Sequence, residues 1–191
     1  MRKGVIANII AGVVLVGALG YYNFMDKASV SDAQMGKKCP DFTAQTYTAD
    51  GDSFLLSGDT FTLSEQAGKV CVVNFWETWC QACIQELPSF NQIQEEYEGQ
   101  VEVIAIAGVT STADSALTWL NSKGWKAYDD KSEWTDFSLT IAYMPTANCV
   151  ELGCGGMLPR TVIVDKEGNI AHEQDGPMTH EALQNIIEGL L

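Results

Sequence analysis

The longest apolar stretch of the chain lies near its N-terminus. Residues 4–24 carry no charged side chain, and Arg2 and Lys3 stand directly before them. A run of about 20 apolar residues is long enough to cross a membrane, and basic residues before such a run keep that end in the cytoplasm. The pattern therefore predicts a single N-terminal membrane segment, with the rest of the chain on the far side of the membrane.

The same pattern divides the chain into three parts. We predict, in order, a signal anchor over residues 1–25, a linker over 26–37 and a folded domain over 38–191. A cleaved signal peptide is the alternative, with the small residues Ala18 and Gly20 at its cleavage site. An anchor is favoured because the run exceeds the usual apolar length of a signal peptide, about 7–15 residues. In both cases the folded domain is extracytoplasmic.

Within the folded domain, the apolar positions predict strands and helices in alternation. Val70–Trp76 is apolar and rich in β-branched residues, as a strand buried on both faces requires. The following stretch is helical up to Tyr97, and Val101–Ala107 is a second apolar strand, which should run parallel to the first. The other predicted elements are a β-hairpin around a turn at 49–52, helices over 111–123 and 132–143, an extended piece over 125–130, a loop over 144–158, a hairpin of 161–164 with 170–173, and a last helix capped by Thr179.

Two cysteines, Cys80 and Cys83, lie at the junction between the first of these strands and its helix. A Cys-x-x-Cys pair in this position is typical of thioredoxin-like redox proteins. Free backbone N–H groups and the helix dipole stabilise a thiolate at the start of a helix. We therefore predict that Cys80 attacks a substrate disulfide and that Cys83 resolves the mixed disulfide.

A static disulfide or a metal-binding pair is the alternative interpretation of these two thiols. A zinc site would need two further ligands, and His172 and His180 are the only histidines. We expect neither a metal nor another cofactor.

The net charge of the chain indicates which classes of partner it can bind. Its 25 acidic residues outnumber its 11 Lys and Arg residues, which gives a formal net charge of −14 at pH 7. Nucleic-acid binding requires a basic surface, so we expect no nucleic-acid partner.

Several motifs, taken together, make the chain resemble the membrane-anchored TlpA/ResA-like branch of the thioredoxin superfamily, over roughly residues 36–191. The matching segments are Lys38–Phe42, Asn74–Cys83, Glu86–Pro88 and Leu158–Asp165. The resemblance implies an α/β, thioredoxin-like fold: a central mixed sheet flanked by helices, with an extra N-terminal β-hairpin. It also implies an extracytoplasmic thiol–disulfide oxidoreductase that reduces exported clients, such as apocytochrome c or repair enzymes. A membrane electron donor of the thiol-transfer type would supply the electrons.

The resemblance also assigns roles to residues around the two thiols. Pro159 would follow a cis peptide bond and face the disulfide, leaving the backbone edge at Leu158 free to pair with a client peptide. Glu86 lies one helical turn beyond Cys83 and would be an active-site acid that tunes the thiols. Asn74 occupies the place where ordinary thioredoxins keep a buried Asp, so Glu86 is the favoured proton handler.

The residues next to Cys80 indicate the direction of the reaction. We expect Trp79 to be a half-exposed platform beside the thiol. The intervening dipeptide, Gln81 and Ala82, contains neither His nor Pro. It lacks the cationic neighbour of a strongly oxidising disulfide, which favours a reducing protein.

A second pair of thiols, Cys149 and Cys154, lies in the loop before Pro159. One hypothesis is a structural disulfide, since paired thiols of exported proteins usually oxidise. The other is a redox pair that relays electrons to Cys80 and Cys83, because the loop is expected beside the active face. The first hypothesis is favoured.

Three other functions compete with disulfide reduction. A disulfide-forming oxidase would use the same thiols in the opposite direction, and a metallochaperone would use them to bind metal. A thiol peroxidase of the related peroxiredoxin architecture would need a Thr three residues before its cysteine. Thr78 lies two residues before Cys80, which does not fit that spacing.

Overall fold

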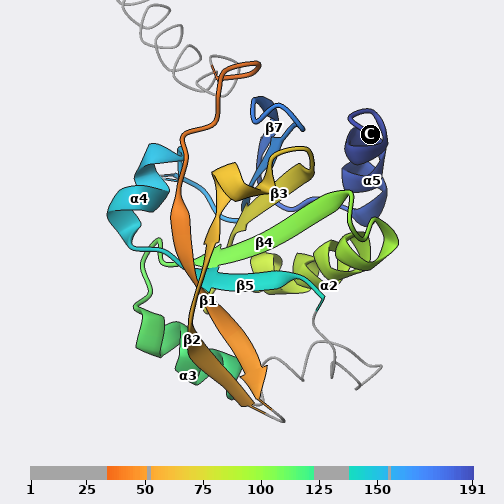
Figure 1. Ribbon diagram of the computed structural model, residues 1–191. Helices are drawn as coiled ribbons and strands as arrows, with labels where there is room; N and C mark the ends of the chain where they lie inside the picture. The colour runs from red at the N-terminus through yellow and green to blue at the C-terminus, as the bar shows by residue number, and fades with distance from the viewer. Residues whose placement is uncertain (1–33, 51–52, 123–137, 155) are drawn as a thin grey trace, which may run out of the picture. The chain divides into compact units, whose positions relative to one another are not determined.

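The computed structural model describes residues 34–50, 53–122, 138–154 and 156–191. Residues 36–191 form one compact unit, in which seven strands make a single sheet with the order β2-β1-β5-β4-β3-β6-β7 (Figure 1). The strands are β1 (Thr43–Asp50), β2 (Ser53–Thr62), β3 (Val70–Phe75), β4 (Val101–Ala107), β5 (Thr140–Tyr143), β6 (Arg160–Val164) and β7 (Ile170–Asp175). The helices are η1 (Leu63–Gln66), α2 (Gln81–Glu96), α3 (Ala113–Leu120), α4 (Thr146–Glu151) and α5 (His180–Glu188).

The sheet is mixed, and β3 lies near its centre. All six residues of β3 are buried, and the strand pairs in parallel with β4 and antiparallel with β6. The antiparallel pair of β1 and β2 extends the sheet beyond β5. The unit of β3, α2 and β4 is the one that the apolar pattern of the sequence predicts.

Two apolar clusters cover the two faces of this sheet, because side chains alternate along a strand. Val70 and Val72 of β3 belong to a cluster with residues of α2, α3 and α5. Cys71 and Val73 belong to a second cluster with residues of η1 and α4. Figure 1 shows α2 and α5 side by side, and the hydroxyl of Tyr97 donates to Glu188 at 2.9 Å between them.

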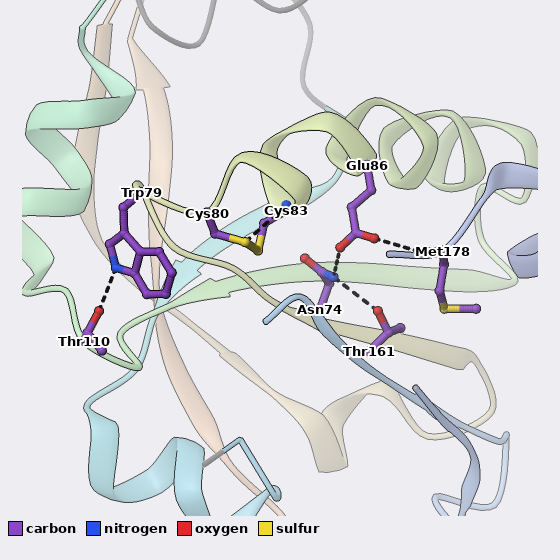
Figure 2. The surroundings of a disulfide bond; sticks show 8 residues. All are labelled: Asn74, Trp79, Cys80, Cys83, Glu86, Thr110, Thr161 and Met178. Atoms are coloured by element: carbon purple, nitrogen blue, oxygen red, sulfur yellow. Dashed lines mark hydrogen bonds between the residues drawn. A yellow bond between two sulfur atoms is a disulfide. The ribbon is translucent and has the colours of Figure 1, made fainter. Parts of the chain in front are cut away.

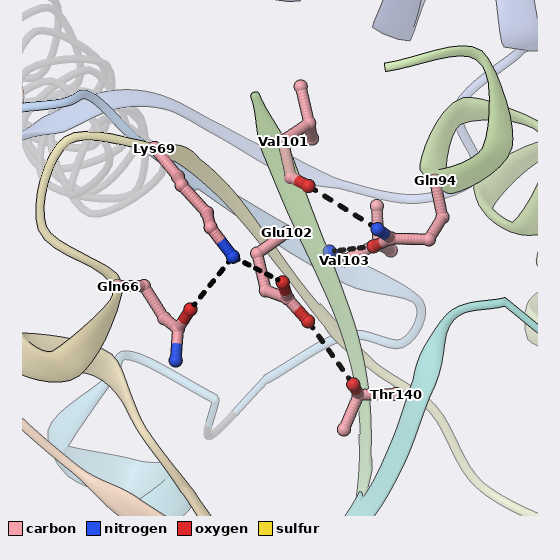
Figure 3. Close-up of polar contacts among 7 residues, drawn as sticks. All are labelled: Gln66, Lys69, Gln94, Val101, Glu102, Val103 and Thr140. Carbon is pink, nitrogen blue, oxygen red and sulfur yellow. Dashed lines mark hydrogen bonds and ion pairs between the residues drawn. The ribbon is translucent and has the colours of Figure 1, made fainter. Parts of the chain in front are cut away.

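A buried glutamine on α2 fixes this helix against β4. The side-chain amide of Gln94 donates to the carbonyl of Val101 at 3.3 Å and accepts from the N–H of Val103 at 2.6 Å (Figure 3). The β5 partner strand begins only opposite Ile104, so Gln94 satisfies backbone groups that the sheet leaves unpaired. This contact holds the helix that carries the cysteines in one position on the sheet.

An ion pair joins the start of β3 to β4 on the other face. The ammonium of Lys69 lies 3.1 Å from the carboxylate of Glu102, which also accepts from the hydroxyl of Thr140 at 3.3 Å (Figure 3). The pair is partly exposed, so its contribution to stability is small, about 0–1 kcal/mol. The apolar clusters hold the central strands together.

Two of the expected elements are wrong. Thr140–Tyr143 is strand β5, not the end of a helix over 132–143, and α4 occupies part of the segment expected to be a loop. A four-residue apolar run carries too little periodicity to separate a strand from a helix, and its pairing with β4 decides the outcome. The expected extended piece over 125–130 lies outside the described residues, as does the predicted membrane segment. Across the ranges that the structure does describe, no helix has the length and apolar character needed to span a membrane.

Candidate functional site

Cys80 and Cys83 form a disulfide at the N-terminus of α2. Cys80 is the N-cap residue, and its sulfur accepts the backbone N–H of Cys83 at 3.3 Å. Cys80 is 6% exposed and Cys83 is fully buried. An incoming sulfur therefore reaches Cys80 first, and the free N–H groups of the first helical turn surround the position of its thiolate.

Glu86 lies one turn further along α2, on the buried side of the helix (Figure 2). Its two carboxyl oxygens accept one hydrogen bond each, from the side-chain amide of Asn74 at 2.9 Å and from the N–H of Met178 at 2.9 Å. Burial raises the pKa of Glu86 from 4.5 to about 7, against the opposing effect of these two hydrogen bonds. Near neutral pH this carboxyl can therefore both take up and release a proton.

The peptide bond between Leu158 and Pro159 is cis, as the resemblance implied. In the pairing of β3 with β6, Phe75 lies opposite Arg160. Pro159 is therefore level with the end of β3, where the chain turns toward Cys80. Leu158 is half-buried against both apolar clusters, and the preceding Met157 is 62% exposed.

Trp79 is more exposed than the sequence indicated, at 65% of its surface. Its indole N–H donates to the hydroxyl of Thr110, in the loop after β4, at 3.0 Å (Figure 2). Beyond Cys80, Gln81 is exposed and Ala82 is half-buried. The surface around the disulfide therefore presents the apolar ring of Trp79, and the hydrogen bond of its indole N–H to Thr110 holds the ring in place.

Glu77 is a second buried carboxylate, and the sequence analysis did not single it out. It is fully buried, and Oε1 accepts the N–H groups of Gly108, Thr110 and Ser111 at 3.4, 2.7 and 3.1 Å. Oε2 accepts the hydroxyl of Ser111. Glu77 thus holds the loop that carries Thr110, and through it the indole of Trp79. A carboxylate directly after a run of buried apolar residues is the only sequence signal for this role.

Cys149 and Cys154 do not form the disulfide that the sequence favoured. Both are free, buried thiols in the cluster on the α4 face of the sheet, whereas Cys80 and Cys83 belong to the cluster on the other face. Burial is the main cause that raises the pKa of Cys149 to about 11 and of Cys154 to about 12. The favoured hypothesis of a structural disulfide between them is therefore wrong, because the structure holds both as free thiols.

The other two cysteines belong to the same cluster. Cys39 and Cys71 are also free and buried, and burial raises their pKa values to about 11 and about 12. Among the described residues, no three side chains of His, Cys, Asp or Glu are grouped as a metal site.

Known proteins resemble this chain over most of its length. The chain is 29% identical over 185 residues to the thioredoxin-like protein YneN of Bacillus subtilis, covering 94% of this chain and 96% of that protein. It is 28% identical over 195 residues to the thiol-disulfide oxidoreductase ResA of Bacillus cereus, covering 98% of each chain. In both cases the likeness extends over nearly the whole length of both proteins.

Solved structures show the same fold. A putative thiol:disulfide interchange protein DsbE from Chlorobium tepidum superposes with a TM-score of 0.63 at 23% identity, over 82% of this chain and 96% of that one. The exposed lipoprotein thioredoxin Etrx1 of Streptococcus pneumoniae gives a TM-score of 0.60 at 22% identity, over 79% and 100%. The fold is therefore thioredoxin-like. The model of the AhpC/TSA family matches residues 35–173, and the chain belongs to this family.

Proposed function

We propose that the protein is a thiol–disulfide oxidoreductase that reduces the disulfides of exported client proteins with Cys80 and Cys83. One observation carries this proposal above the others: a disulfide at a helix N-terminus lies on the same buried face as a carboxyl whose pKa is about 7. The likeness to proteins named thiol-disulfide oxidoreductases over nearly the full chain supports it.

The reaction follows from the unequal exposure of the two sulfurs. In the reduced protein, the thiolate of Cys80 attacks one sulfur of a client disulfide, and the other client sulfur leaves as a thiolate and takes up a proton. The thiolate of Cys83 then attacks the Cys80 sulfur, which releases the second client sulfur as a thiol. Two electrons pass to the client, and Cys80 and Cys83 end as a disulfide.

Glu86 serves the second step in this proposal. The sulfur of Cys83 must lose its proton before it can attack, and water does not reach it because it is fully buried. A neighbouring carboxyl with a pKa of about 7 can take that proton at neutral pH and release it afterwards. Pro159 and Leu158 border the disulfide, and the backbone at Leu158, together with Trp79 and Met157, forms the surface that receives the client peptide.

The proposal includes the place of the protein in the cell. Residues 1–25 would anchor it in the cell membrane, residues 26–37 would form a linker, and the catalytic domain would be extracytoplasmic. A membrane donor of the thiol-transfer type would return the disulfide to the dithiol. The uncharged stretch of 4–24, with Arg2 and Lys3 before it, supports this arrangement.

The direct experiment is to trap the client. Cys83→Ser removes the resolving thiol, so mixed disulfides between Cys80 and clients should accumulate and be released by dithiothreitol. Cys154→Ser, a matched change on the other face of the sheet, should trap nothing. If Cys83→Ser traps no protein and Cys80→Ser leaves the thiol states of exported proteins unchanged, the proposed function is wrong. A reduction potential near about −120 mV, as in strong oxidants, would contradict the reducing direction.

A further inference from the structure

Asn74, on β3, has one buried polar atom that the proposed function leaves unexplained. The side chain is fully buried. Its Nδ2 donates to Oε1 of Glu86 at 2.9 Å and to the hydroxyl of Thr161 at 3.2 Å. Its Oδ1 is buried and has no hydrogen-bond partner among the described residues. A buried acceptor without a donor costs free energy, so its presence in the oxidised protein calls for an explanation.

The position of Oδ1 of Asn74 offers an explanation for its missing hydrogen bond. Figure 2 shows the carboxamide of Asn74 between the disulfide and Glu86, with its oxygen on the side of Cys83. In the disulfide, the sulfur of Cys83 carries no hydrogen and cannot donate. In the dithiol, it carries an S–H group, and the full burial of Cys83 keeps water away from it.

We propose that Asn74 is a positioning residue of the redox couple: its Oδ1 accepts the S–H of Cys83 in the reduced protein, while its Nδ2 holds Glu86. The inference rests on the proposed function and adds a residue to it. On reduction by a dithiol donor, the bond between Cys80 and Cys83 breaks, two electrons and two protons arrive, and the donor becomes a disulfide. One of these protons becomes the S–H that satisfies Asn74.

This role predicts the direction in which Asn74 shifts the equilibrium between the disulfide and the dithiol. The acceptor is unsatisfied in the oxidised protein and satisfied in the reduced one, so Asn74 favours the dithiol. Replacing it with a residue that cannot accept should therefore shift the couple toward the disulfide. We expect a change of about tenfold in the equilibrium constant against dithiothreitol, the size of one buried hydrogen bond to a neutral group.

The equilibrium test compares matched variants in a Glu86→Gln background, which removes the titration of that carboxyl. Asn74→Ala and Asn74→Leu, one leaving space and one filling it, should both move the equilibrium toward the disulfide. Thr161→Val removes only an acceptor of Nδ2 and should change it by less than about twofold. Asn91→Ala removes a different buried side-chain amide, on α2, which accepts the backbone N–H groups of Ser138 and Leu139. This variant should lower stability without moving the equilibrium. No shift in the Asn74 variants, or an equal shift in Asn91→Ala, would overturn the proposal.

The decisive spectroscopic measurement is made with Asn74 unchanged. The infrared S–H stretching band of Cys83 is isolated as the difference between Cys80→Ser and Cys80→Ser/Cys83→Ser. With Asn74 present this band should lie at the lower frequency of a hydrogen-bonded thiol, and Asn74→Asp, which keeps an acceptor, should preserve it. A band at the frequency of a free thiol would overturn the proposal, whether or not the Asn74 variants fold. Because the band is independent of turnover, it separates this inference from the proposed function, which fails if the wild-type protein reduces no protein disulfide.

Discussion

Two buried glutamates flank the disulfide, and they have different surroundings. Glu77 receives three backbone N–H groups and one hydroxyl, all from the loop after β4. Glu86 receives one backbone N–H and one side-chain amide. The four donors tie the side chain of Glu77 to this loop. At Glu86 the effect of burial exceeds that of the two hydrogen bonds and raises the pKa of the carboxyl to about 7. The two side chains are both buried but differ in the number of donors that they receive, and Glu77 fixes a loop whereas Glu86 lies beside the thiols.

The largest effect should come from removing the carboxylate with four donors. Glu77→Ala leaves these donors without their charged acceptor, and we expect a loss of about 3–4 kcal/mol in the free energy of unfolding. Urea denaturation of the oxidised protein measures it, with Glu65→Ala, an exposed residue, as the matched control. If Glu77→Ala costs no more than the control, Glu77 does not hold the loop.

A pH-dependent effect on stability should come from Glu86. Its pKa is about 7 in the folded protein, above the ordinary glutamate value of 4.5, so the folded state favours the protonated carboxyl. The resulting stability is fully present below pH 4.5 and is lost as the pH rises through about 7, a change of about 3 kcal/mol. The difference in unfolding free energy between wild type and Glu86→Gln should change by this amount between pH 4 and pH 8. A difference that is constant over this range would place Glu86 with Glu77 as a structural residue.

The sequence predicted the parts of this site that depend on local pattern. Cys80 and Cys83 follow a strand that is recognisable from its apolar residues, and helical spacing places Glu86 one turn beyond Cys83. The role of Glu86 as an active-site acid came from the family resemblance. The cis bond before Pro159 came from the family resemblance. The positions of the two thiols and of Glu86 need only the order of residues along one strand and one helix.

The parts that depend on long-range contacts were not predictable in the same way. The role of Glu77 is set by a loop about thirty residues further along, and its own neighbours in sequence do not reveal it. The burial of Cys149 and Cys154 on the α4 face depends on β5 and α4, the two elements that the sequence pattern placed wrongly. Short elements take their conformation from the sheet they join, so their own residues specify them poorly.

The smallest effect on activity should come from replacing Cys149 and Cys154. Cys149→Ala/Cys154→Ala should leave the rate of insulin reduction within about twofold of wild type, because the pair lies on the face opposite the disulfide and burial raises both pKa values. The same double variant should lose about 1 kcal/mol per residue in stability, from lost packing. A large loss of activity in a folded double variant would restore the relay hypothesis and would extend the redox chemistry beyond the side of the sheet that holds Glu86.

The central claim is that a carboxyl next to the disulfide titrates near neutral pH. The most direct measurement is a ¹³C NMR titration of the side-chain carboxyl of Glu86 in the oxidised protein, assigned by comparison with Glu86→Gln. The account predicts a midpoint at a pH of about 7. A midpoint near 4.5, the ordinary pKa of a glutamate, would contradict it.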